Sequence, residues 1–205
     1  KRSGELQWSI PTNRTDAMPI VLNNGDVIVS GGVPIGAFDF LPFFGSLPSI
    51  QYITQSNNTP TILWDSALDT HDDTNANGIW DFGESFLSIG GWTHQPIVTS
   101  IDTNINTPML LVGTAPATTP GVQFAHNTDL SLIDLTKLPT DPGFIVEHFS
   151  GAGSTPAMID SWIYTSGESG IHAFSPSKSP TPTQLMHQYT QGTITIHQLI
   201  NLLRK

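Results

Sequence analysis

Short apolar runs separated by glycine, proline and asparagine turns restrict this chain to an all-β fold. Residues 19–31 read as two short strands around an Asn-Asn-Gly-Asp turn, and residues 156–167 have the same layout. A weaker copy starts at Pro96 and resumes at Pro108, after an inserted turn at residues 102–107. We therefore predict repeated hairpins of antiparallel strands.

The repeats extend beyond the hairpins. The first and last copies continue to an Ala-Phe pair, Ala37-Phe38 and Ala173-Phe174. The phenylalanine follows the opening proline by 19 residues in the first copy and by 18 residues in the last. The opening prolines are separated by 77 and 60 residues, an irregular spacing that is compatible with insertions. An outer strand or glycine turn is predicted before each copy, at residues 5–10, 88–92 and 144–151.

This layout resembles the blades of pyrroloquinoline-quinone-like β-propellers, which run as Leu-x-Trp, Pro-x-Val, Gly-x-Val-Tyr-Val-Gly and Leu-x-Ala-Phe-Asp. In the first repeat the matching residues are Leu6, Trp8, Pro19, Val21, Gly25, Val27, Val29, Gly31, Ala37, Phe38 and Asp39. In the last repeat they are Pro156, Met158, Ile163, Tyr164, Ser166, Gly170, Ile171, Ala173 and Phe174. The resemblance implies blades of four antiparallel strands.

A complete ring needs more residues than this chain supplies. At the usual blade size, 205 residues suffice for about three or four blades. We therefore expect a partial propeller, a fragment of a longer chain, or a ring that another chain completes. A β-sandwich with repeated turns is the alternative fold.

Residues 73–84 carry the strongest chemical signal. They fit the EF-hand-like calcium pattern D-x-[DN]-x-[DN]-G-x5-E without a gap. Calcium takes six to eight oxygen ligands at about 2.3–2.6 Å, and alternate positions of a tight loop can supply them. The predicted Ca²⁺ ligands are the side chains of Asp73, Asn75, Asn77, Asp81 and Glu84, together with the backbone carbonyl of Ile79.

A hairpin turn rich in Asn, Asp and Gly is the alternative reading, but it does not explain Glu84 at the closing position. Two of the side-chain ligands are amides, so the site carries a formal charge of about −3, which indicates the roughly 10⁻⁴–10⁻³ M affinity of extracellular modules. The flanking residues do not read as a helix pair. The loop resembles isolated calcium loops of secreted prokaryotic proteins. Asp69, His71 and Asp72 are candidates for a further ligand.

Two domains are expected. The first is a propeller-like β domain at residues 1–180, with the calcium loop at 73–84. A Ser/Thr/Pro-rich linker at residues 176–182 spans the end of this domain. Residues 181–205 hold a final strand at 184–189 and a short C-terminal helix. Helical spacing predicts that helix, through Ile196, Leu199, Ile200 and Leu203.

Composition narrows the function. The formal net charge is −10 and charged residues make up only 12% of the chain, which argues against nucleic acid and anionic membranes as partners. Cysteine is absent, so thiol nucleophiles and thiolate metal sites are excluded. No apolar run is long enough to insert into a membrane. Low charge with abundant Gly, Pro, Thr and Asn is typical of secreted or cell-surface β proteins. Asn13 and Asn57 match the N-glycosylation pattern.

No catalytic constellation is recognisable. The seven histidines make no HxH or HxxxH pair, and no G-x-S-x-G elbow occurs. We expect a non-catalytic, extracellular or cell-surface calcium-binding protein that acts as a structural or binding module. A protein or a carbohydrate is a candidate partner, and an oligomer or association with further blades is compatible with the repeats. The alternatives are a self-assembling subunit of a surface filament or layer, and a fragment of a quinone-dependent dehydrogenase.

Overall fold

The fold is all-β, as predicted. The structure is a computed structural model, and strands account for 44% of the residues that it describes, all in antiparallel sheets. The chain divides into two compact units, Lys1–Phe174 and Ser175–Lys205. The described residues are 4–32, 47–78, 80–81, 84–91, 94–99, 108–114, 129–150, 155–159, 162–167, 170–175, 186, 189–190, 195–196 and 200.

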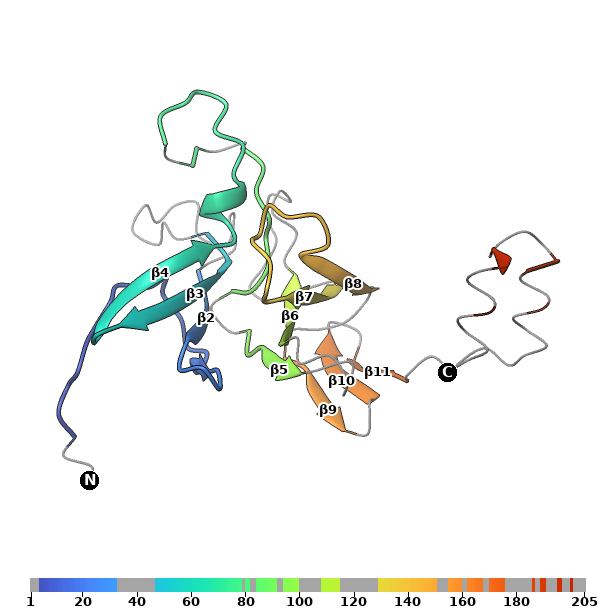
Figure 1. Cartoon of the computed structure of the whole chain (residues 1–205). Coiled ribbons are helices and arrows are strands. Elements are labelled where there is room, and N and C mark those ends of the chain that lie inside the picture. The colour runs from blue at the N-terminus through green and yellow to red at the C-terminus, as the bar shows by residue number, and fades with distance from the viewer. Residues whose placement is uncertain are drawn as a thin grey trace. The chain divides into compact units, whose positions relative to one another are not determined.

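Three sheets make up the first unit, and in each one the strands follow one another in chain order (Figure 1). The first sheet contains β1 (Ile20–Val21), β2 (Val27–Gly31), β3 (Ser49–Ser56) and β4 (Thr59–Asp65). The second contains β5 (Ile97–Thr99), β6 (Met109–Thr114), β7 (Asp129–Asp134) and β8 (Ile145–Ser150). The third contains β9 (Ala157–Ile159), β10 (Trp162–Gly167) and β11 (Gly170–Phe174).

The predicted hairpins open all three sheets. β1 pairs with β2, β5 with β6, and β9 with β10, each antiparallel and each preceded by a proline. In the first hairpin, Gly25 adopts a φ of +89° and the Asn24 side chain donates to the Asp26 carboxylate at 2.6 Å. Glycine tolerates this left-handed backbone, so the turn residues account for the hairpin locally. The Ala37-Phe38 pair lies outside the described residues.

The two central strands of the second sheet, β6 and β7, are buried on both faces. Side chains alternate along a strand, so Leu110 and Val112 of β6 face the first sheet while Leu111 faces the third. Against the first sheet they pack in a cluster with Ile28, Ile50, Tyr52, Trp64, Ile89, Ile133, Leu135 and Phe144. On the opposite face, Leu111, Leu130 and Leu132 pack with Ile163 and Phe174. The three sheets therefore stack in three layers, whereas a simple β-sandwich has only two.

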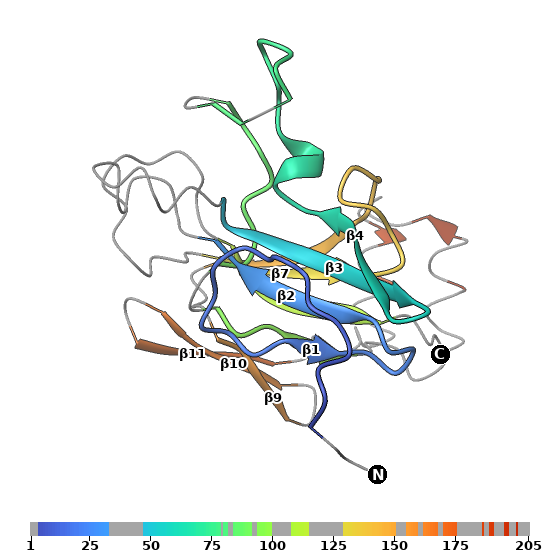
Figure 2. The ribbon, with the colours of Figure 1, turned by 90° about the vertical axis from the view of Figure 1, so that its left-hand side faces the viewer.

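The prediction of an outer strand at residues 5–10 is wrong, because these residues lie in no strand. Side-chain contacts hold this segment against the first sheet instead: Trp8 Nε1 donates to Gln55 Oε1, and Asn13 N donates to Gln51 Oε1, both at 2.9 Å. Figure 2 views this sheet, with β1, β2 and β3 side by side. The outer strand expected at residues 144–151 does form, as β8, but it completes the second sheet.

Most of the described residues of the second unit are helical. Met186 and Tyr189 are helical, so the final strand predicted at 184–189 is wrong for these two residues. A lone strand needs a neighbouring strand for its backbone hydrogen bonds, whereas a helix satisfies its own. Ile196 and Ile200 of the predicted C-terminal helix are helical. Among the described residues, no helix has the length and apolar character that crossing a membrane requires.

Candidate metal centre

The predicted calcium loop leaves the first sheet after β4 and projects beyond a 3₁₀ turn, η1 (Leu68–Thr70) (Figure 1). Asp65, at the end of β4, starts this turn. Its carboxylate accepts hydrogen bonds from Ala67 N at 3.0 Å and Leu68 N at 3.2 Å. A buried carboxylate therefore directs the chain out of the sheet and into the loop.

Hydrogen bonds close the base of the loop. Asp72 N donates to Ser85 O at 2.8 Å. One step closer to the sheets, Thr70 Oγ1 donates to Ser66 O at 2.6 Å and accepts a hydrogen bond from Leu87 N at 2.8 Å. Both stems are thus tied together before the chain reaches the predicted ligands.

Asp73 organises the first half of the loop. Its carboxylate accepts hydrogen bonds from Asn77 N at 3.0 Å and Gly78 N at 2.7 Å. These N–H groups, that of Gly78 foremost, lower the pKa of Asp73 and keep it ionised. A Cβ at Gly78 would meet nothing within 4 Å, so its φ of +75°, rather than lack of space, favours glycine there.

Glu84 joins the two ends of the loop. Only 5% of its surface is exposed. One carboxylate oxygen accepts hydrogen bonds from Thr74 N at 2.7 Å and Thr74 Oγ1 at 3.0 Å, and the other accepts from Asp81 N at 2.8 Å. The N–H of Asp81, followed by the groups of Thr74, lowers the pKa of Glu84. The sequence pattern explained Glu84, but it did not single out Thr74.

The other predicted ligands gather around Asp81. The side-chain amides of Asn75 and Asn77 both donate to its Oδ2, at 2.6 and 2.8 Å. Five of the six predicted ligands therefore lie in one closed loop, whereas Ile79 lies outside the described residues. A cation in the loop would take the place of the amide protons as the partner of Asp81.

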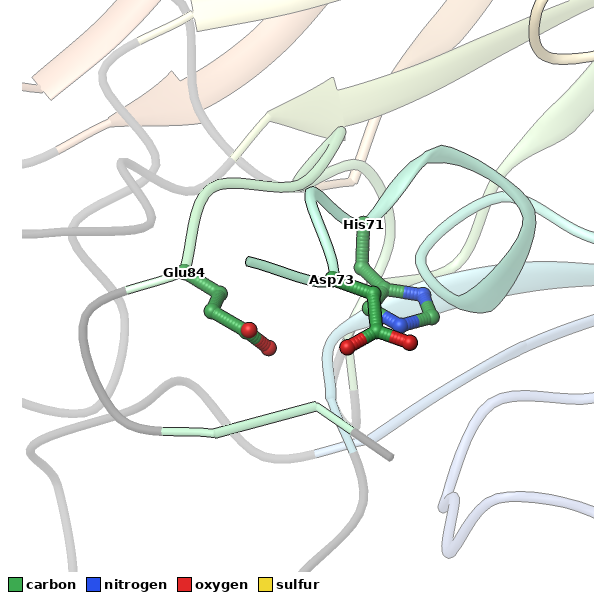
Figure 3. A group of neighbouring side chains, drawn as sticks. All are labelled: His71, Asp73 and Glu84. Atoms are coloured by element: carbon green, nitrogen blue, oxygen red, sulfur yellow. The ribbon is translucent and has the colours of Figure 1, made fainter. Parts of the chain in front are cut away.

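His71 is the upstream candidate that the structure brings to the predicted ligands. One ligand atom each of His71, Asp73 and Glu84 lie within 4.8 Å of one another, and Figure 3 shows their side chains converging. Asp69 instead accepts a hydrogen bond from Asp65 N at 3.0 Å, next to η1. Asp72 is exposed.

Lysine and arginine are absent from the sequence on either side of these carboxylates. No lysine or arginine occurs in the sequence between Arg14 and Lys137, a stretch that contains the whole loop and both of its stems. The carboxylates of Asp73, Asp81 and Glu84 therefore share one loop without a basic neighbour in sequence. Carboxylate and amide oxygens are the donors that calcium prefers, so the donor set fits the ion.

Comparison with known proteins assigns no family. No protein-family model matches the chain, and no curated protein matches it. The resemblance to quinone-type propellers and to EF-hand loops therefore stays a prediction, and the site is argued from its own geometry.

Trp80 couples the loop to its surroundings. Its Nε1 donates to Glu84 O at 2.9 Å, and its ring meets the Phe86 ring edge-on at 6.0 Å between centroids. An indole tied to the closing residue should change its emission when the loop binds an ion. We therefore expect the fluorescence of Trp80 to change when an ion binds to this loop.

Proposed function

We propose that this protein is a non-catalytic calcium-binding β-repeat module that acts outside the cell or at its surface. One observation carries the proposal. The side chains of Asp73, Asn75, Asn77, Asp81 and Glu84 gather in a loop that hydrogen bonds close at its base. Extracellular fluids offer the high calcium concentrations that a site of modest affinity needs.

Calcium suits this loop better than magnesium. Residues 75–78 are exposed and contribute little to the core, so the loop depends on its polar contacts for order. A divalent ion held by three carboxylates would offset their mutual repulsion, and its binding free energy would offset the conformational entropy that is lost when the loop becomes ordered. Magnesium demands near-ideal octahedral geometry and gives up its water reluctantly.

The position of the loop supports a structural role. It lies between β4 of the first sheet and Ile89, which is fully buried in the core shared with the second sheet. Just after Ile89, Gly90 N donates to Gly113 O of β6 at 2.8 Å. Ordering the loop would therefore stiffen the connection between two stacked sheets.

A calcium titration of chelator-treated protein, followed by tryptophan fluorescence, tests the proposal. We expect a saturable change that Glu84→Gln abolishes and that Trp80→Phe makes smaller. Asp72→Asn is the matched control, because it removes a neighbouring negative charge but none of the six predicted ligands of the loop, and Asp72 is exposed and lies outside the group of His71, Asp73 and Glu84. It should leave the response intact. A wild-type protein that shows no response and retains no calcium would refute the proposal.

Assembly into a filament or layer is the second candidate, and the outer face of the third sheet favours it. Trp162 and Tyr164 of β10 stack on each other with ring centroids 6.2 Å apart. Cross-strand pairing places Ile159 beside Trp162, and Ile171 beside Ser166, on the same face. These four apolar side chains are 38–82% exposed.

A second copy of the chain is the partner that this face suits. Strands β9, β10 and β11 contain no Asp, Glu, Lys or Arg, whereas the whole chain carries a net charge of −10. Copies would repel one another least where these strands meet. Light scattering should show a dimer or larger species that Ile171→Asp disrupts and that Leu6→Asp, the same change at an exposed leucine elsewhere, preserves. A wild-type monomer at every concentration, with and without calcium, would rule out this candidate.

A further inference from the structure

Building on the proposed metal site, we infer that His71 is a metal ligand, and that His71, Asp73 and Glu84 together bind a first-row transition ion such as Zn²⁺ or Co²⁺ in competition with calcium. The sequence pattern of the loop supplies oxygen donors only. His71 would add a nitrogen donor and so a second class of ion.

The hydrogen bond of His71 decides which ring nitrogen is available. Its Nδ1 lies 2.6 Å from Leu68 O, and a carbonyl oxygen can only accept, so the proton is assigned to Nδ1. In the neutral ring the lone pair is then on Nε2. Metal-binding histidines use the same arrangement, in which the other ring N–H donates to a carbonyl that fixes the tautomer and the ring orientation.

The Nε2 atom itself points to a missing partner. It is buried and has no hydrogen-bond partner among the residues that the structure describes. Its neighbours in the cluster, the carboxylates of Asp73 and Glu84, are acceptors as well. A buried lone pair on Nε2 that has no donor and faces two carboxylates is unfavourable, and a bound cation would be a partner for all three groups.

The donor set separates two classes of ion. Zinc and cobalt accept imidazole nitrogen together with carboxylate oxygen, whereas calcium takes oxygen ligands. Asp73 and Glu84 belong to both sets, so the two ions exclude each other. Asn75, Asn77 and Asp81 belong to the calcium set alone, and His71 belongs to the transition-metal set alone.

The rigid base of the loop favours this geometry before any ion arrives. η1 positions His71 directly after Thr70, whose hydroxyl bonds to both stems. Asp73 and Glu84 lie just inside the backbone hydrogen bond from Asp72 N to Ser85 O. The three donors are therefore held at the most constrained part of the loop, which lowers the cost of assembling a site.

Cobalt serves as the probe, because its visible absorption reports coordination directly. The chelator-treated protein, residues 1–205, is titrated with Co²⁺ and then back-titrated with Zn²⁺ and with Ca²⁺. We expect one equivalent of Co²⁺ to bind, Zn²⁺ to displace it, and millimolar Ca²⁺ to compete. His71→Gln should weaken Co²⁺ binding at least about tenfold while leaving calcium affinity within about twofold. Asp81→Asn should show the opposite pattern, and Glu84→Gln should weaken both ions.

His148→Gln is the control for adventitious binding, since it removes a histidine of β8 without touching the loop. Far-UV circular dichroism of each variant establishes that the fold is retained. Absence of a Co²⁺ spectrum in the wild type, or equal Co²⁺ affinity in His71→Gln, would overturn the inference while leaving calcium binding intact. If Co²⁺ binds through His71 but calcium does not bind, the transition-metal site stands, whereas its competition with calcium and the proposed calcium function both fail.

Discussion

Calcium should stabilise the folded protein by an amount that the loop composition predicts. Three carboxylates and two amides indicate a dissociation constant of roughly 10⁻⁴–10⁻³ M. About 10 mM free calcium then exceeds that constant ten- to hundredfold, which adds about 1.4–2.7 kcal/mol to the free energy of unfolding. For a chain of this size each kcal/mol raises the melting temperature by about 2–4 °C. We therefore expect an increase of about 3–11 °C, lost in Glu84→Gln.

Thermal melting followed by circular dichroism at matched ionic strength measures this increase. Sodium chloride controls for screening of the net charge of −10, and magnesium controls for a generic divalent effect. Asp72→Asn should keep the full increase, because Asp72 is not one of the six predicted ligands in the loop and lies outside the group of His71, Asp73 and Glu84. An equal increase in Glu84→Gln, or with salt alone, would refute specific binding in the loop. No increase in the wild type would mean that residues 73–84 form only a turn.

Three further predictions concern the fold. Phe144→Ala should cost about 3–5 kcal/mol in urea unfolding, because Phe144 is 1% exposed and packs edge-on against Trp64 between the first two sheets; a cost below about 1 kcal/mol would contradict this packing. Gly90→Ala should destabilise far more than Gly78→Ala, since a Cβ at Gly90 would lie 2.7 Å from a backbone oxygen whereas one at Gly78 meets nothing; comparable melting temperatures would contradict that contrast. Burial lowers the pKa of His94, so the folded protein keeps it neutral. The stability linked to His94 is therefore complete above about pH 6.5 and declines as the pH falls, because the unfolded chain then takes up a proton that the folded state resists. Urea unfolding at pH 7.5 and 5.5 should show a smaller difference for His94→Asn than for the wild type, and an equal difference would remove His94 as the cause.

The turns of this protein could be predicted because they depend on residues that are close together in the sequence. The turn at Gly25 and the loop around Gly78 depend on residues within a few positions, and glycine at a left-handed φ determines both. Residues 5–10 and 184–189 mark the limit of such reasoning. Each contains apolar residues that suit a strand, but a strand also needs a partner, and partners are distant in sequence. Side-chain contacts fasten the first segment to β3, and the described residues of the second are helical.

The sequence by itself determined the antiparallel hairpins, the all-β class and the set of oxygen donors in residues 73–84, because short-range turn preferences and residue chemistry are local properties. Only the tertiary structure decided that the second sheet lies between the other two, since β6 carries apolar residues toward both faces and the packing of distant strands chooses their partners. It alone also brought His71 to Asp73 and Glu84. That placement depends on η1 and on the hydrogen bonds that close the loop at Thr70 and Asp72, which join stems that are separated along the chain.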